Sequence, residues 1–465
     1  MKNMNFKKYS SLTLLGLGGI LSSVHGADAP AVAASAGAWQ KPAWLTDLAL
    51  GVKESYDDNL LGVSGKGLPT KSSWITAISP KVGLNFAPLL GDQKTLQTLS
   101  LVYSPDFNYY HGAPSQSFNA HKIGDSIKFK TGDFSFALDN AFLYNDGNHQ
   151  APIYALNQGA AAVGQYDKNR NNFAHGMARE RMAQIQDRAN ITLQYDWKNI
   201  FVRPTASLLY YDLNTDWHNS KNAPWKGYQN YVDRSDVNGG VDFGYKLTAK
   251  LAATLGYRYG SQYQQQLPTA IDTDNHYSSS DYQRVLLGLE GKPWNWLTVK
   301  LAGGPDFRDY NSMAPVSDSR PATYYGEAVL TATITPKQSI TFNYKQWQWV
   351  SSTGKVPSFD SSYGLTYHWN ATKQLGLDLG GKVQEADYTS GNENNPTGQN
   401  SSLRDDIAYT LSGGLTYAFS PHFSASLTYT YDIGDNGFNN LPANLASAYR
   451  EFDHQLVSLG LQYKF

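Results

Sequence analysis

The chain has 465 residues, no cysteine, a formal net charge of −1 and only 17% charged residues. Its mean hydropathy of −0.46 excludes a bundle of apolar membrane helices. Its 32 tyrosines, 41 glycines and 13% aromatic content exclude a disordered chain, because disordered chains are poor in aromatic residues. The near-neutral charge is not that of a nucleic-acid binder, so we expect no nucleic-acid partner. These features indicate a large β-rich protein.

The N-terminal segment has the pattern of an export signal. Lys2, Lys7 and Lys8 precede the apolar run 12–21, and small residues follow up to Gly26. The run is about half as long as a membrane-spanning helix, so we predict a signal peptide over 1–26 rather than an anchor helix. Its removal changes the formal net charge from −1 to −4. Residues 27–43 are rich in alanine and contain two prolines, which predicts a flexible lead-in.

From residue 44 onward the hydrophobic pattern has a period of two. At the C-terminus, apolar residues at odd positions from Val457 to Phe465 alternate with small or polar residues. Successive strand residues point to opposite faces, so one face of each strand is apolar and the other polar. Such runs reach roughly 10 to 15 residues, whereas ordinary strands centre on about 5 to 6 and tilted membrane strands need about 9 to 11. The length favours a membrane barrel over a soluble sandwich or propeller.

The alternation predicts eighteen strands, separated by turns and loops. They are expected at residues 45–56, 74–86, 97–110, 119–130, 133–145, 186–197, 200–213, 235–247, 250–263, 281–292, 296–310, 323–334, 338–350, 361–369, 374–388, 404–418, 422–433 and 453–465. Short and long connections alternate along the chain, as in barrels with short periplasmic turns and long outer loops. We therefore predict an all-β protein whose residues 44–465 form a single transmembrane antiparallel up-and-down barrel of 16–18 strands.

Aromatic residues and prolines mark particular places in this pattern. Several aromatic residues flank the short turns, among them Trp197, Trp294, Trp296, Trp369 and Phe419, which is typical of an interfacial girdle.

Four prolines fall inside predicted strands: Pro80, Pro105, Pro204 and Pro305. Because a closed barrel has no free edge for proline, these positions require bulges or different strand limits.

Two segments carry a resemblance to known proteins. The end of the chain, with Leu461, Tyr463 and the terminal Phe465, resembles the assembly signal that barrel-insertion machinery reads in Gram-negative outer-membrane barrels. The segment 50–60 (LGVKESYDDNL) is similar to the opening of the β-barrel porin 2 family, where a Gly-rich strand runs into a Tyr-Asp-x-Asn segment. The resemblance implies a barrel in the outer membrane, with its lipid and the assembly machinery as partners and no catalytic residues to carry over.

A barrel of 16 to 18 strands leaves an aqueous channel, so we expect passive diffusion of small polar solutes through a lumen lined by the polar face. The charged residues of that face are Lys53, Lys81, Lys128, Arg188, Arg258, Arg284, Lys300, Arg308, Lys345, Lys382 and Lys464, with Asp139, Asp242, Glu290, Glu327, Asp378 and Asp432. The excess of cations favours a mild preference for anions. Alternatively, these cations pair with carboxylates across strands and make the lumen merely polar, and a one-residue slip would change the set.

The longest expected loop, 146–185, contains Arg170 and the run Arg179-Glu180-Arg181. General porins resemble this arrangement in having their constriction on the third outer loop. We expect the loop to fold into the lumen, with these residues at the constriction. The alternative is a loop that stays on the surface.

Motifs for chemistry are missing from the sequence. It contains no His-Glu-x-x-His, Gly-x-Ser-x-Gly, P-loop or dinucleotide motif, so we expect no enzyme, no metal and no cofactor. The acidic runs 272–275 and 432–436 are interpreted as surface turns rather than calcium sites. Two other functions stay open: a receptor or adhesin that displays its loops and conducts little, and a barrel-embedded lipid enzyme using His368 or His454. Assembly of several copies of the chain also stays open.

Overall fold

The computed structural model describes residues 41–60, 72–91, 94–147, 183–212, 233–265, 279–310, 322–350, 358–388, 404–438 and 452–465. The expected signal peptide over 1–26 and most of the lead-in over 27–43 lie outside these residues. Among the described residues, no helix is both long enough and apolar enough to span a membrane. The two helical segments that they contain are short 3₁₀ turns, η1 (Ala87–Leu90) and η2 (Pro114–Gln116).

The described part of the chain forms nineteen strands in one sheet. Their bounds are β1 Leu45–Asp57, β2 Ser73–Asn85, β3 Leu96–Tyr103, β4 Asp106–Tyr110, β5 Phe118–Thr131, β6 Phe134–Asn145, β7 Gln184–Trp197, β8 Ile200–Asp212, β9 Arg234–Thr248, β10 Leu251–Gln264, β11 Ser280–Trp294, β12 Leu297–Tyr310, β13 Ala322–Thr335, β14 Gln338–Trp349, β15 Ser358–Asn370, β16 Leu375–Tyr388, β17 Arg404–Ala418, β18 Phe423–Phe438 and β19 Phe452–Lys464.

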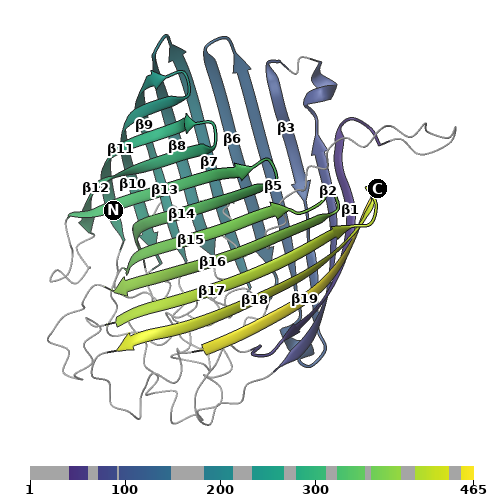
Figure 1. Ribbon diagram of the computed structural model, residues 1–465. Coiled ribbons are helices and arrows are strands. Elements are labelled where there is room, and N and C mark those ends of the chain that lie inside the picture. The colour runs from purple at the N-terminus through teal and green to yellow at the C-terminus, as the bar shows by residue number, and fades with distance from the viewer. Residues whose placement is uncertain are drawn as a thin grey trace, which may run out of the picture.

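The sheet closes on itself as an up-and-down barrel (Figure 1). Each strand pairs antiparallel with its neighbours in the chain, and β19 pairs with β1, with Leu461 opposite Val52. β3 and β4 lie between the same two neighbours, β2 and β5, so together they occupy one strand position. The barrel therefore has 18 strand positions, and the predicted all-β barrel fold is confirmed.

The four prolines inside the strand runs lie where the ladder is interrupted. Pro105 separates β3 from β4, and Pro80 of β2 lies opposite that break. Pro204 falls between the pairs Thr192–Thr205 and Tyr195–Val202 of β7 and β8. Pro305 falls in a similar gap between β11 and β12. Because proline has no N–H to donate, each one is accommodated where its neighbour makes no ladder hydrogen bond on that side.

The two faces of the barrel wall are chemically opposite. Large apolar side chains such as Leu287, Tyr324 and Leu459 are exposed on the outside, whereas Arg284 and Asp306 are buried on the inside. Short connections lie at the end of the barrel that holds the start of β1, which we call the short-turn end; the opposite end is the long-loop end. The predicted turn at 432–436 is wrong, because β18 continues to Phe438 and pairs with β17 through these residues.

Candidate functional site

The charged residues that the sequence assigned to the lumen lie in the strands, on the face opposite to the exposed apolar side chains. In β10, for example, Leu255, Tyr257 and Tyr259 are exposed outside, while Arg258 points inward and pairs with Asp242 of β9. The inward set comprises Lys53, Lys81, Lys128, Arg258, Arg284, Lys300, Lys345, Lys382, Asp242, Glu290, Glu327 and Asp378.

Several inward cations are paired across strands. Arg258 Nη2 lies 2.7 Å from Asp242 Oδ1, and Lys300 Nζ lies 3.5 Å from Glu327 Oε1. Lys81 likewise pairs with Asp47 at 2.5 Å. These contacts neutralise part of the positive charge that the sequence pattern alone suggested.

Arg203 of β8 was missed by the sequence analysis. Its guanidinium donates to both carboxylate oxygens of Glu290 at 2.8 Å and to Asp242 Oδ2 at 3.1 Å. Glu290 belongs to β11, which is not a sheet neighbour of β8, so the long side chain crosses the inside of β9 and β10. Arg203 is adjacent to Pro204, where the ladder between β7 and β8 is interrupted. This interruption makes it hard to tell from the sequence which side chains of β8 point inward, so Arg203 was not assigned to the lumen.

A larger cluster lies nearer the long-loop end, and we call it the corner network: Arg234, Asp236, Gln262, Tyr282, Arg284, Asp306, Arg308 and Gln348. Arg284 Nε and Arg308 Nη2 both donate to Asp306 Oδ2, at 2.8 and 3.0 Å. The hydroxyl of Tyr282 donates to Asp236 Oδ1 at 2.8 Å. Burial makes such charges costly unless they are paired, and Asp306 pairs with both Arg284 and Arg308.

The corner network connects strands that are not neighbours in the sheet. Gln262 Nε2 of β10 donates to the carbonyl oxygen of Gln348 in β14 at 3.1 Å. Arg234 Nη1 at the start of β9 donates to the carbonyl oxygen of Val350, just after β14, at 3.0 Å. β9 and β10 are therefore linked to β14 on the inside, across the strands that separate them in the sheet.

Lys53, Lys128, Lys345 and Lys382 are inward lysines that form no ion pair with a carboxylate among the described residues. Lys382 Nζ donates to Gln384 Oε1 at 3.1 Å, and Lys345 Nζ lies 4.7 Å from the centre of the Trp347 ring. These residues are inward cations that the ion pairs of the described residues do not neutralise directly.

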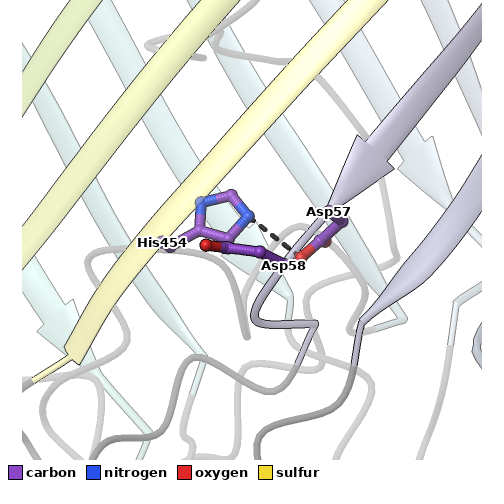
Figure 2. Close-up of side chains that lie close together, drawn as sticks. All are labelled: Asp57, Asp58 and His454. Atoms are coloured by element: carbon purple, nitrogen blue, oxygen red, sulfur yellow. Dashed lines mark ion pairs between the residues drawn. The ribbon is translucent and has the colours of Figure 1, made fainter.

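A second cluster lies where the barrel closes, and we call it the seam cluster: Asp57, Asp58, Asp432 and His454 (Figure 2 shows three of them). His454 Nε2 lies 3.1 Å from Asp57 Oδ1, and Nδ1 lies 3.4 Å from Asp432 Oδ2. Asp57 and His454 are each 2% exposed. The sequence analysis named His454 only as a candidate residue of a lipid enzyme, and Asp57 only as part of the Tyr-Asp-x-Asn resemblance. The alternation in the first and last strands places both side chains on the inner face, and this was the signal that could have linked them.

Backbone contacts hold the seam cluster in place. Asn59 Nδ2 donates to the carbonyl oxygen of Asp453 at 2.8 Å. The amide of Asp58 donates to the carbonyl oxygen of Gln455 at 3.2 Å, and the amide of Gln455 returns a hydrogen bond to Asp58 Oδ1 at 2.7 Å. The chain beyond β1 is thereby attached to β19. His368, the other histidine of interest, lies apart in β15, with Nδ1 2.7 Å from Asp378 Oδ1.

The remaining predicted residues fall into two groups. Arg170, Arg179, Glu180 and Arg181 lie outside the described residues, so their role in a constriction stays a prediction. Leu461, Tyr463 and Phe465 are 48%, 46% and 51% exposed on the outer face. The amide of Phe465 donates to the carbonyl oxygen of Leu48 at 2.9 Å, so the chain end is bound to the first strand.

Comparison with known proteins finds only distant similarity to solved structures. No protein-family model matches the sequence, so the resemblance to the β-barrel porin 2 family is not confirmed. No curated protein matches it significantly. Among solved structures, OccK5 (OpdH) of Pseudomonas aeruginosa is 11% identical, with a TM-score of 0.37, covering 90% of this chain and 98% of that one. OprD of the same organism is 10% identical, with a TM-score of 0.37 and coverage of 90% and 94%. The siderophore receptor PirA of Acinetobacter baumannii is 9% identical, with a TM-score of 0.41 and coverage of 90% and 81%.

Proposed function

We propose that this protein is a porin-like channel of the outer membrane that lets small polar solutes diffuse passively. The observation that carries the proposal is the closed barrel of 18 strand positions, apolar outside and charged inside. Barrels of this size leave an aqueous channel, whereas barrels of about eight strands fill with side chains.

The outer surface supports a position in lipid. Leu287, Tyr324 and Leu459 are 70%, 71% and 57% exposed on the outer wall, and similar residues surround it. Water-soluble monomers rarely expose contiguous apolar surface on this scale. Trp197, Trp294 and Phe419 are exposed at the short-turn end, where an aromatic girdle would meet the headgroups. Together with the predicted signal peptide, this favours the bacterial outer membrane.

Passage through such a barrel depends on width and on charge rather than on a chemical step. Most arginines of the lumen are neutralised by carboxylates, whereas Lys53, Lys128 and Lys382 face it without such a partner among the described residues. Uncompensated positive charge raises the local concentration of anions. This supports a mild preference for anionic or acidic small molecules.

The test is conductance in planar lipid bilayers. The refolded protein should produce discrete ion-conducting steps, and the reversal potential in a salt gradient should show anions passing more readily than cations. Absence of conductance from correctly folded barrels would contradict the channel, and clear cation selectivity would contradict the charge preference alone. Empty bilayers and the refolding detergent serve as controls.

One observation favours the alternative of a receptor or adhesin that conducts little. The corner network crosses from β9 and β10 to β14 near the long-loop end and so occupies part of the lumen there. If this contact closes the pathway, the unmodified barrel should be silent in bilayers, and Gln262→Ala, which removes one link, should begin to conduct. A barrel that conducts before the substitution excludes a closed receptor.

For assembly, we propose that the last strand is recognised by the barrel-insertion machinery through Leu461, Tyr463 and Phe465. All three project outward from the strand that closes the barrel, where another protein can reach them before closure. Phe465→Ala should reduce the amount of protein recovered in outer membranes, with Phe419→Ala, an exposed aromatic in a turn, as control. Equal recovery of both variants and the wild type would contradict the signal.

A further inference from the structure

We propose that Asp57, Asp58 and His454 form a binding site for one divalent transition-metal ion of the Zn²⁺ type, on the inside of the barrel at the long-loop end of the seam. One carboxylate oxygen from each aspartate and one nitrogen of His454 all lie within 4.8 Å of one another. Figure 2 shows the imidazole of β19 directed at the carboxylates at the end of β1.

The imidazole is the first reason to place a ligand here. The His454 side chain is buried, with 2% of its surface exposed, and its Nε2 atom has no hydrogen-bond partner. The nearest carboxylate oxygen, Asp57 Oδ1, is 3.1 Å away, which is an ion-pair distance. A metal ion bound by both groups would use the lone pair of Nε2, a buried atom that makes no hydrogen bond.

The second reason is the support behind the imidazole. Nδ1 faces Asp432 Oδ2 at 3.4 Å, and Asp432 Oδ1 accepts a hydrogen bond from Thr410 Oγ1 at 2.6 Å. A histidine that binds metal usually donates its other ring N–H to a carboxylate, which sets the tautomer and directs the free nitrogen at the metal. Asp432 has this position, and β17 in turn orients Asp432.

The two aspartates are also held in place by the backbone. Asp57 Oδ1 accepts from the amide of Asn59 at 3.0 Å, and Asp58 Oδ1 accepts from the amide of Gln455 at 2.7 Å. Each carboxylate keeps a second oxygen for a metal. The pinning of both side chains before binding reduces the entropy that ligation would cost.

The donor set selects the class of metal. Imidazole nitrogen suits zinc, copper, iron and nickel, whereas calcium takes six to eight oxygen ligands. Zinc bound by nitrogen and carboxylate oxygen at about 2.0–2.2 Å in a tetrahedron needs ligand atoms about 3.4 Å apart. His454 Nε2 and Asp57 Oδ1 are already 3.1 Å apart, so only the more widely spaced atoms, which lie within 4.8 Å, would have to approach. Water from the lumen would complete the tetrahedron. Because the ligands come from the first and last strands, the ion would fasten the seam.

The experiment uses the full mature chain without a polyhistidine tag, refolded in detergent, freed of metal by a chelator, and titrated calorimetrically with Zn²⁺ or Ca²⁺. We expect one Zn²⁺ per chain and far weaker Ca²⁺ binding. His454→Ala and Asp58→Asn should each lower the affinity for Zn²⁺ at least tenfold, and Asp432→Asn by about 10–100-fold, because it supports the ligand. His368→Ala is the matched control: it removes another lumenal histidine–aspartate pair and should leave binding unchanged.

Failure to saturate with Zn²⁺, or equal affinity in His454→Ala and the wild type, would overturn the site and leave a protonated imidazole paired with Asp57 and Asp432. Folding of each variant is checked by the mobility shift of unheated samples in detergent gels. If His454→Ala does not fold, Asp58→Asn decides, since asparagine keeps the oxygen that accepts from Gln455. None of these outcomes depends on whether the barrel conducts.

Discussion

The wall of β9–β12 and the wall of β16 and β17 follow the same alternating sequence pattern but differ in how closely their strands approach. A Cβ atom added at Gly240 would lie 1.9 Å from the carbonyl oxygen of Tyr257, and one at Gly304 would lie 2.0 Å from that of Val285. At Gly381 and Gly413 the nearest atoms are leucine methyl groups at 3.8 and 3.7 Å. Glycine permits a close backbone approach in the first wall and is merely tolerated in the second.

The chemistry of the lumen changes with this geometry. The strands of the first wall carry most of the corner network, where Arg284, Arg308 and Asp306 are buried together. The second wall presents Lys382, which pairs with no carboxylate among the described residues. A close, curved wall thus carries a fixed set of paired charges, while the open wall leaves charge available to solutes.

The largest effect should come from breaking the corner network. Asp306→Ala leaves two buried guanidinium groups without their shared carboxylate, and removal of one partner of a buried ion pair costs about 3–5 kcal/mol. We expect the free energy of unfolding to fall by this amount in denaturant titrations of the protein in lipid vesicles.

Asp47→Ala is the control for this substitution, because its pair with Lys81 is much more exposed. Exposed pairs contribute about 0–1 kcal/mol, so the loss should be correspondingly small. Equal losses of unfolding free energy in the two variants would show that the buried pairs of the corner network contribute no more to stability than an exposed pair does.

An intermediate effect is expected at the glycines. Gly304→Ala should lower the free energy of unfolding by about 1–3 kcal/mol, since the new methyl group meets backbone that must shift. Gly413→Ala has room and restricts the unfolded chain, so it should be neutral or stabilising by about 0.4–1 kcal/mol. The same denaturant titration measures both, and equal destabilisation of the two would refute the contrast between the walls.

The smallest effect is expected from the free lysine of the open wall. Lys382→Glu reverses one charge in a water-filled space, where two charges 4 Å apart interact by about 1 kcal/mol. The ratio of anion to cation permeability should therefore fall by less than about fivefold, measured from the reversal potential. Lys198→Glu makes the same charge change in a turn at the short-turn end and should change the permeability ratio less. A larger change for Lys198→Glu than for Lys382→Glu would show that selectivity is set at the end of the barrel rather than inside it.

Much of the barrel could be predicted from the period of two. The alternation in segments such as 251–263 and 453–465 places apolar side chains outside and polar ones inside, and strand limits followed to within a few residues. The end of β18 was misplaced because Asp432, Asp435 and Asn436 are typical turn residues, although here the strand continues through them. Local preference was overridden by pairing with β17 along the whole segment.

The sites were less predictable than the strands. The alternation of apolar and polar residues places Arg258 and Asp242 on the same face of the sheet. It does not predict contacts between strands that lie far apart in the sheet. The reach of Arg203 to Glu290 and of Arg234 to Val350 depends on how strongly the wall curves, which the close approaches at Gly240 and Gly304 help to set.

The amino-acid sequence by itself determined that the chain forms long antiparallel strands with one apolar and one polar face, because side-chain direction in a strand alternates residue by residue. Only the tertiary structure decided which polar groups meet. Closure of the sheet brings Asp57 to His454 across 397 positions of sequence, from the pairing of the first strand with the last. Curvature decides the rest, since it determines which inward charges are buried in pairs and which remain in the lumen.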